Sequence, residues 1–271
     1  MNFREIFNNV RQAQPALIFS GFAFAVLFFV LAIISFFDST EILGINRWIK
    51  PMKFASSIAI YLWTLAVYLY FLNGFAKSKI VIAWGVIAMM SGEIILILMQ
   101  AARGTTSHFN VKTPFDNAVF AAMGLMILIN SLLLIYLTFL YFRSSLDLPR
   151  AIVWGFKLGL VVFLLGSAEG GYMSAQLGHS VGVQDGGAGL PFVNWSTEGG
   201  DLRVAHFLGL HAFQAIPLAA LFFVRWRKQF ATALTLGFAL AYFAGFSFIF
   251  IQAAQGKPLF QIQRIRTESL K

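Results

Sequence analysis

Two carboxylates and two histidines lie inside long apolar stretches of this sequence, where ionisable side chains are rare. Glu93 and Glu169 lie in the third and fifth of these stretches, and His206 and His211 lie in the sixth. Because an ionisable group is costly to bury in lipid, it normally faces the interior of a helix bundle and marks a candidate functional site. A carboxyl group and an imidazole can exchange protons with a bound molecule. We therefore take these four residues as the candidate catalytic residues.

The positions of these residues along their predicted helices place them at two depths. Glu93 lies ten residues before the end of its helix, and His211 lies ten residues after the start of its own. At ~1.5 Å of rise per residue, both lie about 15 Å below the same face. Glu169 and His206 lie roughly 7 to 9 Å below that face. If the protein is an enzyme, Glu93 and His211 are the predicted acid–base pair, with Glu169 and His206 second.

Further polar residues gather toward the same face. Gln100 follows Glu93 by seven residues and Arg103 follows Gln100 by three, so all three share one side of a helix. Gln214 lies three residues after His211 and shares its face. Arginine side chains at this end would hold an anionic group through paired donors. The predicted substrate-binding residues are Gln100, Arg103, His108, Asp201, Arg203, Gln214 and Gln252.

Structural roles offer an alternative explanation for several polar residues. Asp201 suits the N-cap of a helix, and Asp116, three residues after Thr113, suits a helix start. Lys53 and Lys157 can extend their ammonium groups toward the membrane surface. Buried carboxylates can hold helices together as protonated or salt-bridged groups, and histidines in loops can be structural or solvated. The sequence leaves both explanations open.

Helices must position these residues, because the composition is that of a membrane protein. The 271 residues are 59% hydrophobic and 11% charged, whereas a soluble domain is about 25% charged. Helices satisfy their backbone hydrogen bonds within lipid, and about 20 apolar residues cross it. The sequence thus predicts an all-α polytopic integral membrane bundle of seven transmembrane helices in a single domain over residues 1–271. The predicted spans are Pro15 to Phe37, Pro51 to Leu72, Lys79 to Ala102, Pro114 to Phe142, Arg150 to Ser174, Asp201 to Val224 and Phe230 to Ala254.

The distribution of basic residues predicts the topology. Nine basic residues lie in short connections on the face of the N-terminus, against six on the opposite face and four in the C-terminal tail. Short cytoplasmic loops are enriched in Lys and Arg, so we predict a cytoplasmic N-terminus and an extracytoplasmic C-terminus. One long connection, at about residues 175–200, is rich in glycine and is predicted to be extracytoplasmic. Its apolar residues from Pro191 to Trp195 suggest that it folds back onto the bundle.

Metal and haem binding remain alternatives. His206 and His211 are five residues apart, about 140° around a regular helix, so they cannot both bind one ion. We therefore predict no metal and no cofactor. Seven helices with histidines near one face are similar in architecture to the alkaline ceramidases and adiponectin receptors, which are zinc hydrolases, but their His-x-x-x-His motif is missing. Zinc stays an alternative, as does b-type haem with a loop histidine as second ligand.

Partners follow from the charge pattern. The formal net charge is +9, but the basic residues flank apolar blocks, where they set topology and meet anionic lipid headgroups. We predict membrane lipids and a small-molecule or lipid ligand as partners, and no nucleic acid. A proton-coupled transporter using Glu93 and His211 is a further alternative. The chain shows neither the internal repeats nor the polar path through its inner half that a transporter typically has.

Three motifs resemble those of a group of uncharacterised bacterial seven-helix inner-membrane proteins. These motifs are Lys50-Pro-Met-Lys-Phe54, Arg103-Gly-Thr-Thr-Ser-His-Phe-Asn110 and the segment from Asn194 to His206. The resemblance spans most of the chain and implies a location in the bacterial inner membrane, but it implies no chemistry. The predicted function is an extracytoplasmic-facing polar pocket that binds or processes a small or lipid-derived molecule by carboxylate–histidine chemistry. A receptor that binds its ligand without turnover would use the same pocket.

Overall fold

A computed structural model describes residues 3–187 and 189–260 of the chain. Within these residues, seven helices are long and apolar enough to cross a membrane, which confirms the predicted all-α seven-helix bundle. Each predicted boundary lies within three residues of the observed one. The seven helices are α2 (Pro15–Phe37), α3 (Ile49–Phe71), α4 (Ala76–Ala102), α5 (Pro114–Arg143), α6 (Arg150–Ala175), α7 (Leu202–Trp226) and α8 (Ala231–Ala254). A short helix α1 (Phe3–Ala13) precedes them, and a 3-10 turn η1 (Lys228–Phe230) precedes α8.

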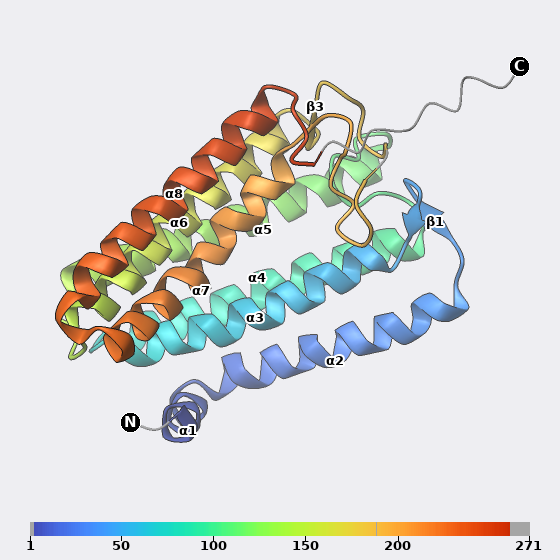
Figure 1. The fold of residues 1–271 in the computed structure, drawn as a ribbon. Helices are drawn as coiled ribbons and strands as arrows, with labels where there is room; N and C mark the ends of the chain where they lie inside the picture. The colour runs from blue at the N-terminus through green and yellow to red at the C-terminus, as the bar shows by residue number, and fades with distance from the viewer. Residues whose placement is uncertain (1–2, 188, 261–271) are drawn as a thin grey trace, which may run out of the picture.

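The helices lie side by side along one long axis, with α2, α3 and α4 on one side and α6, α7 and α8 on the other (Figure 1). Connections of two kinds join them. The short-loop end comprises α1 and the connections 72–75, 144–149 and 227–230. The long-loop end comprises the connections 38–48, 103–113 and 176–201. Two short antiparallel pairs lie at the long-loop end, β1 (Glu41–Ile42) with β2 (Ile45–Asn46), and β3 (Ser180–Val181) with β4 (Gly200–Asp201).

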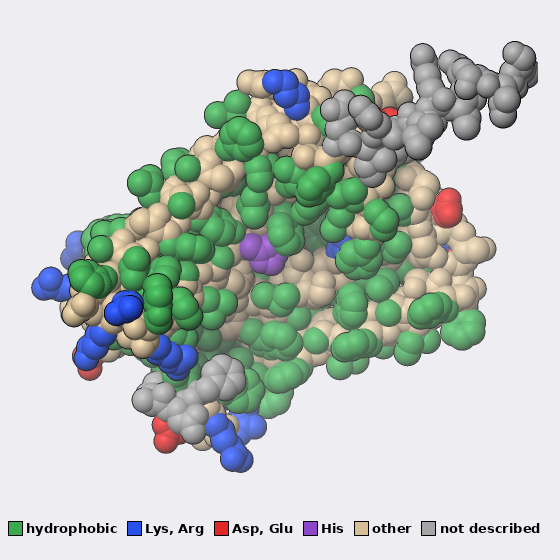
Figure 2. Space-filling view, viewed as in Figure 1, with side chains coloured by type: hydrophobic (Ala, Val, Ile, Leu, Met, Phe, Trp, Pro, Cys, Tyr) green, Lys and Arg blue, Asp and Glu red, His purple; other side chains and the backbone are tan. Residues whose placement is uncertain are grey.

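The outer flank of the bundle is apolar. Large hydrophobic side chains such as Phe36, at 86% exposed, and Phe37, at 87%, point away from the core. Figure 2 shows hydrophobic side chains over the middle of the molecule and Lys and Arg side chains gathered at the short-loop end. A contiguous exposed apolar surface would make a protein aggregate in water, so this flank suits contact with lipid.

Glycines bring α6 and α7 into backbone contact. A Cβ built on Gly166 would lie 2.7 Å from the Cα of Gly209, and one built on Gly155 would lie 2.8 Å from the Cβ of Ala220. A side chain larger than hydrogen therefore does not fit at Gly155 or Gly166 unless α7 moves away. Gly166 and Gly170, four residues apart on α6, form a small-residue face that packs closely against α7, as such faces do in membrane bundles.

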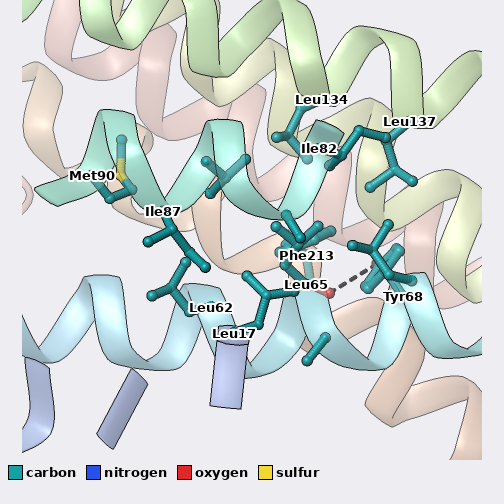
Figure 3. Close-up of a cluster of buried hydrophobic side chains, with 14 of the residues drawn as sticks. Leu17, Leu62, Leu65, Tyr68, Ile82, Ile87, Met90, Leu134, Leu137 and Phe213 are labelled. Carbon is teal, nitrogen blue, oxygen red and sulfur yellow. Dashed lines mark hydrogen bonds between the residues drawn. The ribbon is translucent and has the colours of Figure 1, made fainter. Parts of the chain in front are cut away.

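A proline in α7 creates a polar contact inside the apolar core. Pro217 has no N–H, so the carbonyl of Phe213, four residues earlier, lacks its usual helical donor. The buried hydroxyl of Tyr68 on α3 donates to this carbonyl at 2.9 Å (Figure 3). The rings of Tyr68 and Phe213 also stack, with centroids 4.1 Å apart. The hydrogen bond thus joins α3 to α7 and satisfies the carbonyl of Phe213, for which lipid offers no donor.

The glycine-rich connection (residues 176–187 and 189–199) folds back onto the bundle, as predicted. The pairing of β3 with β4 closes its two ends against each other. The ammonium group of Lys53 on α3 donates to the carbonyl oxygen of Val193 at 3.3 Å. The ring of Trp195 packs edge-on against Phe207 of α7, with centroids 5.7 Å apart. The connection therefore covers the ends of α3 and α7.

Candidate functional site

Glu93 is an almost fully enclosed ionisable residue of the candidate site. It lies on the buried stripe of α4 that also carries Met90, Ile97 and Gln100. Its side chain is 2% exposed, and neither carboxyl oxygen has a hydrogen-bond partner among the described residues. A buried carboxyl group without a partner is costly. The group therefore needs a proton, a water molecule or a ligand beside it.

His108 is the histidine that the structure places beside Glu93. Its Nε2 lies 3.6 Å from Oε1 of Glu93. This distance is longer than a hydrogen bond, but one water molecule or ligand hydroxyl could hydrogen-bond to both atoms. Burial lowers the pKa of His108 well below its ordinary value, and the positive charge of Lys50 adds to this effect. The ring is therefore neutral at pH 7 and keeps one nitrogen that can accept a proton.

The loop that carries His108 holds a strained conformation. The neighbouring Phe109 has a φ of +57°, which is unfavourable for an aromatic residue. The side chain of Asn110 stabilises the turn by donating to Thr105 Oγ1 at 2.9 Å and to the carbonyl of Thr106 at 3.0 Å. Side-chain hydrogen bonds thus hold His108 over the end of the bundle.

His206 joins the same electrostatic cluster. Its Nδ1 lies 2.8 Å from the carbonyl oxygen of Gly166; because a carbonyl only accepts, this nitrogen carries the hydrogen. In the neutral ring Nε2 therefore keeps its lone pair. The ring lies against Gly170, where an added Cβ would be 2.8 Å from Cε1. His206 and Lys50 both interact electrostatically with His108.

Glu169 is a second buried carboxyl group without a partner. It lies on α6 between Gly166 and Gly170, which contact α7. Glu169 is 5% exposed, and neither carboxyl oxygen has a hydrogen-bond partner within residues 3–187 and 189–260. The predicted second pair, Glu169 and His206, thus lies in one small region of the α6–α7 interface. No ion pair joins these two side chains among the described residues, so their pairing stays a prediction.

Gln100 and Arg103 belong to a network that joins α4 to α5. Gln100 Nε2 donates to Oδ1 of Asp116 at 2.9 Å, and Arg103 Nη1 lies 2.6 Å from the same oxygen. Thr113 caps α5, since its Oγ1 accepts from the backbone N–H of Asp116 at 3.1 Å. The helix-start role considered for Asp116 is confirmed. The network accounts for both predicted substrate-binding residues in structural terms.

Asp201 and Arg203 fasten the glycine-rich connection. Asp201 caps α7 by accepting from the backbone N–H of Arg203 at 3.0 Å, and it accepts from the backbone N–H of Ser196 at 2.8 Å. Arg203 forms an ion pair with Asp201 at 2.6 Å and donates to the carbonyl of Asn194. Burial opposes it, but the hydrogen bond from Arg203 holds the pKa of Asp201 below its ordinary value. The N-cap role of Asp201 is confirmed.

His211 and Gln214 make their contacts on another side of α7. The ring centroid of His211 lies 4.2 Å from that of Phe207, and Gln214 Nε2 donates to Thr64 Oγ1 of α3 at 3.1 Å. No contact among the described residues joins His211 to Glu93. The cavity predicted between them therefore stays a prediction.

The remaining predicted and newly found features lie at the long-loop surface. Gln252 donates from Nε2 to the carbonyl of Pro258 at 2.8 Å, and this hydrogen bond caps the end of α8.

A cleft of about 480 Å³ lies between the β1–β2 hairpin and the glycine-rich connection, lined by Leu43, Leu190 and Phe192 among others. None of the predicted site residues lines this cleft. Sequence reasoning missed Lys50, although it begins one of the motifs quoted above.

Residues 3–187 and 189–260 contain no group of three or more His, Asp or Glu side chains arranged to hold a metal ion. The absence of a cofactor stays a prediction. His206, with Nδ1 held by a carbonyl and Nε2 free, has the arrangement that also suits a ligand to a metal, but the described carboxylates do not complete such a site.

Acidification is expected to loosen the glycine-rich connection. Burial and the positive charge of Arg203 lower the pKa of His179 to about 4, against the opposing effect of Asp201 and Asp185. An opened connection would restore the ordinary value of about 6.5. The open form therefore binds more protons between pH 6.5 and pH 4, so the closed form loses stability as pH falls through that window. The opening constant of residues 180–187, obtained from amide hydrogen exchange after correction for the chemical exchange rate, should rise about tenfold from pH 7 to pH 5.

The variant His179→Gln provides the control for this effect, because it removes the titrating group. Exchange in the variant, corrected for the chemical rate, should depend much less on pH. We assign the pH dependence of exchange that remains in the variant to His108, because the pKa of His108 is also lowered. Asp201 titrates below the window, since its pKa lies under 3.8. An equal rise in the wild type and the variant would contradict the assignment to His179.

The fold and its buried ionisable residues define the class of this protein. It is a multi-pass α-helical membrane protein with seven long apolar helices among its described residues. Comparisons of the chain with protein-family models, with curated proteins and with solved structures find no match.

Proposed function

We propose that the protein binds or chemically processes a small or lipid-derived molecule in a polar pocket at the long-loop end, by carboxylate–histidine chemistry. One observation carries this proposal. The carboxyl group of Glu93 is almost fully enclosed, has no hydrogen-bond partner in the part of the chain that the structure describes, and lies 3.6 Å from His108. Folding alone gains nothing from such a group, whereas a ligand hydroxyl or amine beside the pair could hydrogen-bond to both residues.

The chemistry of this pair is proton transfer. The neutral ring of His108 can accept a proton from a ligand, and Glu93 can donate or accept one from the opposite side. Lys50 interacts electrostatically with Glu93 and His108, and its amine can donate hydrogen bonds to an anionic group of the ligand. His206, with its free Nε2, is the second candidate base. The proposal includes no metal ion and no haem.

We further propose that the protein lies in the bacterial inner membrane with its N-terminus in the cytoplasm. The nine basic residues at the short-loop end support this orientation. The glycine-rich connection and the ligand entrance then face the extracytoplasmic side. Arg264, Arg266 and Lys271 of the C-terminal tail lie outside the described residues. Reporter fusions at residue 260 that place this end of the chain in the cytoplasm would reverse the orientation.

The test is to purify the protein gently and identify what it carries. Native mass spectrometry should detect a bound small molecule or lipid in the wild type. The variant Glu93→Gln should lose it by tenfold or more, because a hydrogen bond to a charged group contributes about 1.5 to 3 kcal/mol. Glu41→Gln is the matched control, since Glu41 is exposed on the β1–β2 hairpin, and its occupancy should equal that of the wild type.

Other results of the same purification would replace the proposal. A Soret band with stoichiometric iron would establish the haem alternative, and stoichiometric zinc would establish the metallohydrolase. Unchanged occupancy in Glu93→Gln would remove Glu93 from the site. A protein that carries nothing, and that Glu93→Leu makes more stable, would leave Glu93 with a structural role only.

A further inference from the structure

A second polar site faces the lipid between α3 and α7. We call it the α3–α7 seam. It consists of two stripes at helical spacing, Ile60 and Thr64 on α3 and Phe207, His211, Gln214 and Leu218 on α7. Figure 2 shows a histidine side chain in a hollow of the apolar flank, with hydrophobic side chains around it. The seam is polar at its centre and apolar at both ends.

The exposure of the seam residues shows that lipid can reach it. Phe207 is 46% exposed, Ile60 is 41% exposed and Leu218 is 62% exposed. Thr64 and His211 are both partly exposed. Since the flank of this bundle faces lipid, these side chains are available to a molecule that moves within the membrane.

The hydrogen bonds within the seam are incomplete. Gln214 Nε2 donates to Thr64 Oγ1 at 3.1 Å, and Thr64 Oγ1 donates to the carbonyl of Ile60 at 2.7 Å. Gln214 Oε1 is shielded from solvent and accepts no hydrogen bond of good geometry from the described residues, although His211 lies close enough to interact with the Gln214 side chain. A free amide oxygen at this depth is costly, because lipid offers it no donor.

A hydroxyl group would complete the seam. It can donate to Gln214 Oε1 and accept from an imidazole N–H of His211 at the same time. The ring of His211 already packs on Phe207 at 4.2 Å, so the seam also offers a planar surface on which an aromatic ring can stack. The apolar residues on either side fit a hydrocarbon substituent.

We propose that the α3–α7 seam binds a membrane-borne aromatic alcohol, such as a quinol or a substituted phenol, through His211 and Gln214. This site is reached from the lipid, whereas the Glu93 and His108 site lies under the glycine-rich connection. The inference does not depend on the proposed function. It concerns binding alone and assigns no reaction to the seam.

The experiment measures binding of a decyl-substituted benzoquinol, kept reduced, to the purified full-length protein. The quinol should raise the melting temperature in a saturable manner, and its dimethyl ether, which cannot donate, should bind about tenfold more weakly. Gln214→Met should weaken quinol binding about tenfold and abolish the preference over the ether. Glu93→Gln should leave quinol binding unchanged. Thr64→Val removes the acceptor of Gln214 Nε2 but leaves Gln214 Oε1 in place, so this variant should retain the preference for the quinol.

Three outcomes would overturn the proposal. The quinol and its ether could bind equally, which would show that only apolar contact matters. Gln214→Met, while folded, could bind the quinol as the wild type does. Cysteine crosslinking at Leu218, in this chain that has no native cysteine, could join two copies across the seam, which would make the seam a contact between protomers.

Discussion

Replacing Gly166 with leucine is expected to prevent α6 and α7 from packing and to abolish the folded protein. A Cβ at this position would lie 2.7 Å from backbone atoms of Gly209, and helix backbones cannot move aside without opening the interface. Gly166→Ala adds only that one carbon and should destabilise by about 1–3 kcal/mol, as overpacking of a core does. Thermal unfolding of the purified variants in detergent measures both effects.

Gly171 supplies the matched control on the same helix. A Cβ built there meets no atom within 4 Å. Alanine forms helix better than glycine by up to about 1 kcal/mol, so Gly171→Ala should be neutral or stabilising. If Gly166→Ala and Gly171→Ala gave equal melting temperatures, the close approach of α6 and α7 would not contribute to stability.

The helices of this protein could be predicted from the sequence because their signals are local. The predicted span Pro15 to Phe37 matches α2 at both ends, since a proline begins it and Asp38 follows a long run without charged residues. The start of α4 differs from the predicted one, because Ala76 begins the helix three residues before Lys79. No side-chain cap marks that start, and Phe75 turns the chain with a φ of +56°.

The burial of Glu93 could also be predicted, but its partner could not. The spacing of Glu93 and Gln100 places both on one side of α4, and the structure buries both. His108 reaches Glu93 through a loop whose path depends on Gly104 at φ +72° and Phe109 at φ +57°. Such a path leaves no periodic pattern in the sequence.

Equal depth along two helices does not fix how each helix is rotated. The five-residue spacing of His206 and His211 predicted that they face different directions, and this is what the structure shows. His206 bonds to α6 at Gly166, whereas His211 packs on the partly lipid-exposed Phe207. The contact of Gly209 with Gly166 sets this rotation of α7, and a contact between distant glycines cannot be deduced from depth.

Replacing Tyr68 with phenylalanine is expected to destabilise the protein by about 1–2 kcal/mol, because the carbonyl of Phe213 would lose the hydrogen bond that the Tyr68 hydroxyl donates. The loss should depend on Pro217. In Pro217→Ala, residue 217 regains an N–H that can donate to the same carbonyl in the usual helical manner. Tyr68→Phe should therefore cost little in the Pro217→Ala background. A double-mutant cycle on unfolding free energies measures this coupling, expected at about 1 kcal/mol.

Tyr242 provides the control for the Tyr68 cycle, since its hydroxyl also donates to a carbonyl of α7, that of Leu208, at 2.8 Å. Four residues after Leu208 stands Ala212, which keeps its N–H. Tyr242→Phe should therefore have the same effect with and without Pro217→Ala. If Tyr68→Phe were equally additive with Pro217→Ala, the hydroxyl would not be replacing the donor that proline removes, and the aromatic stacking of Tyr68 on Phe213 would be its contribution instead.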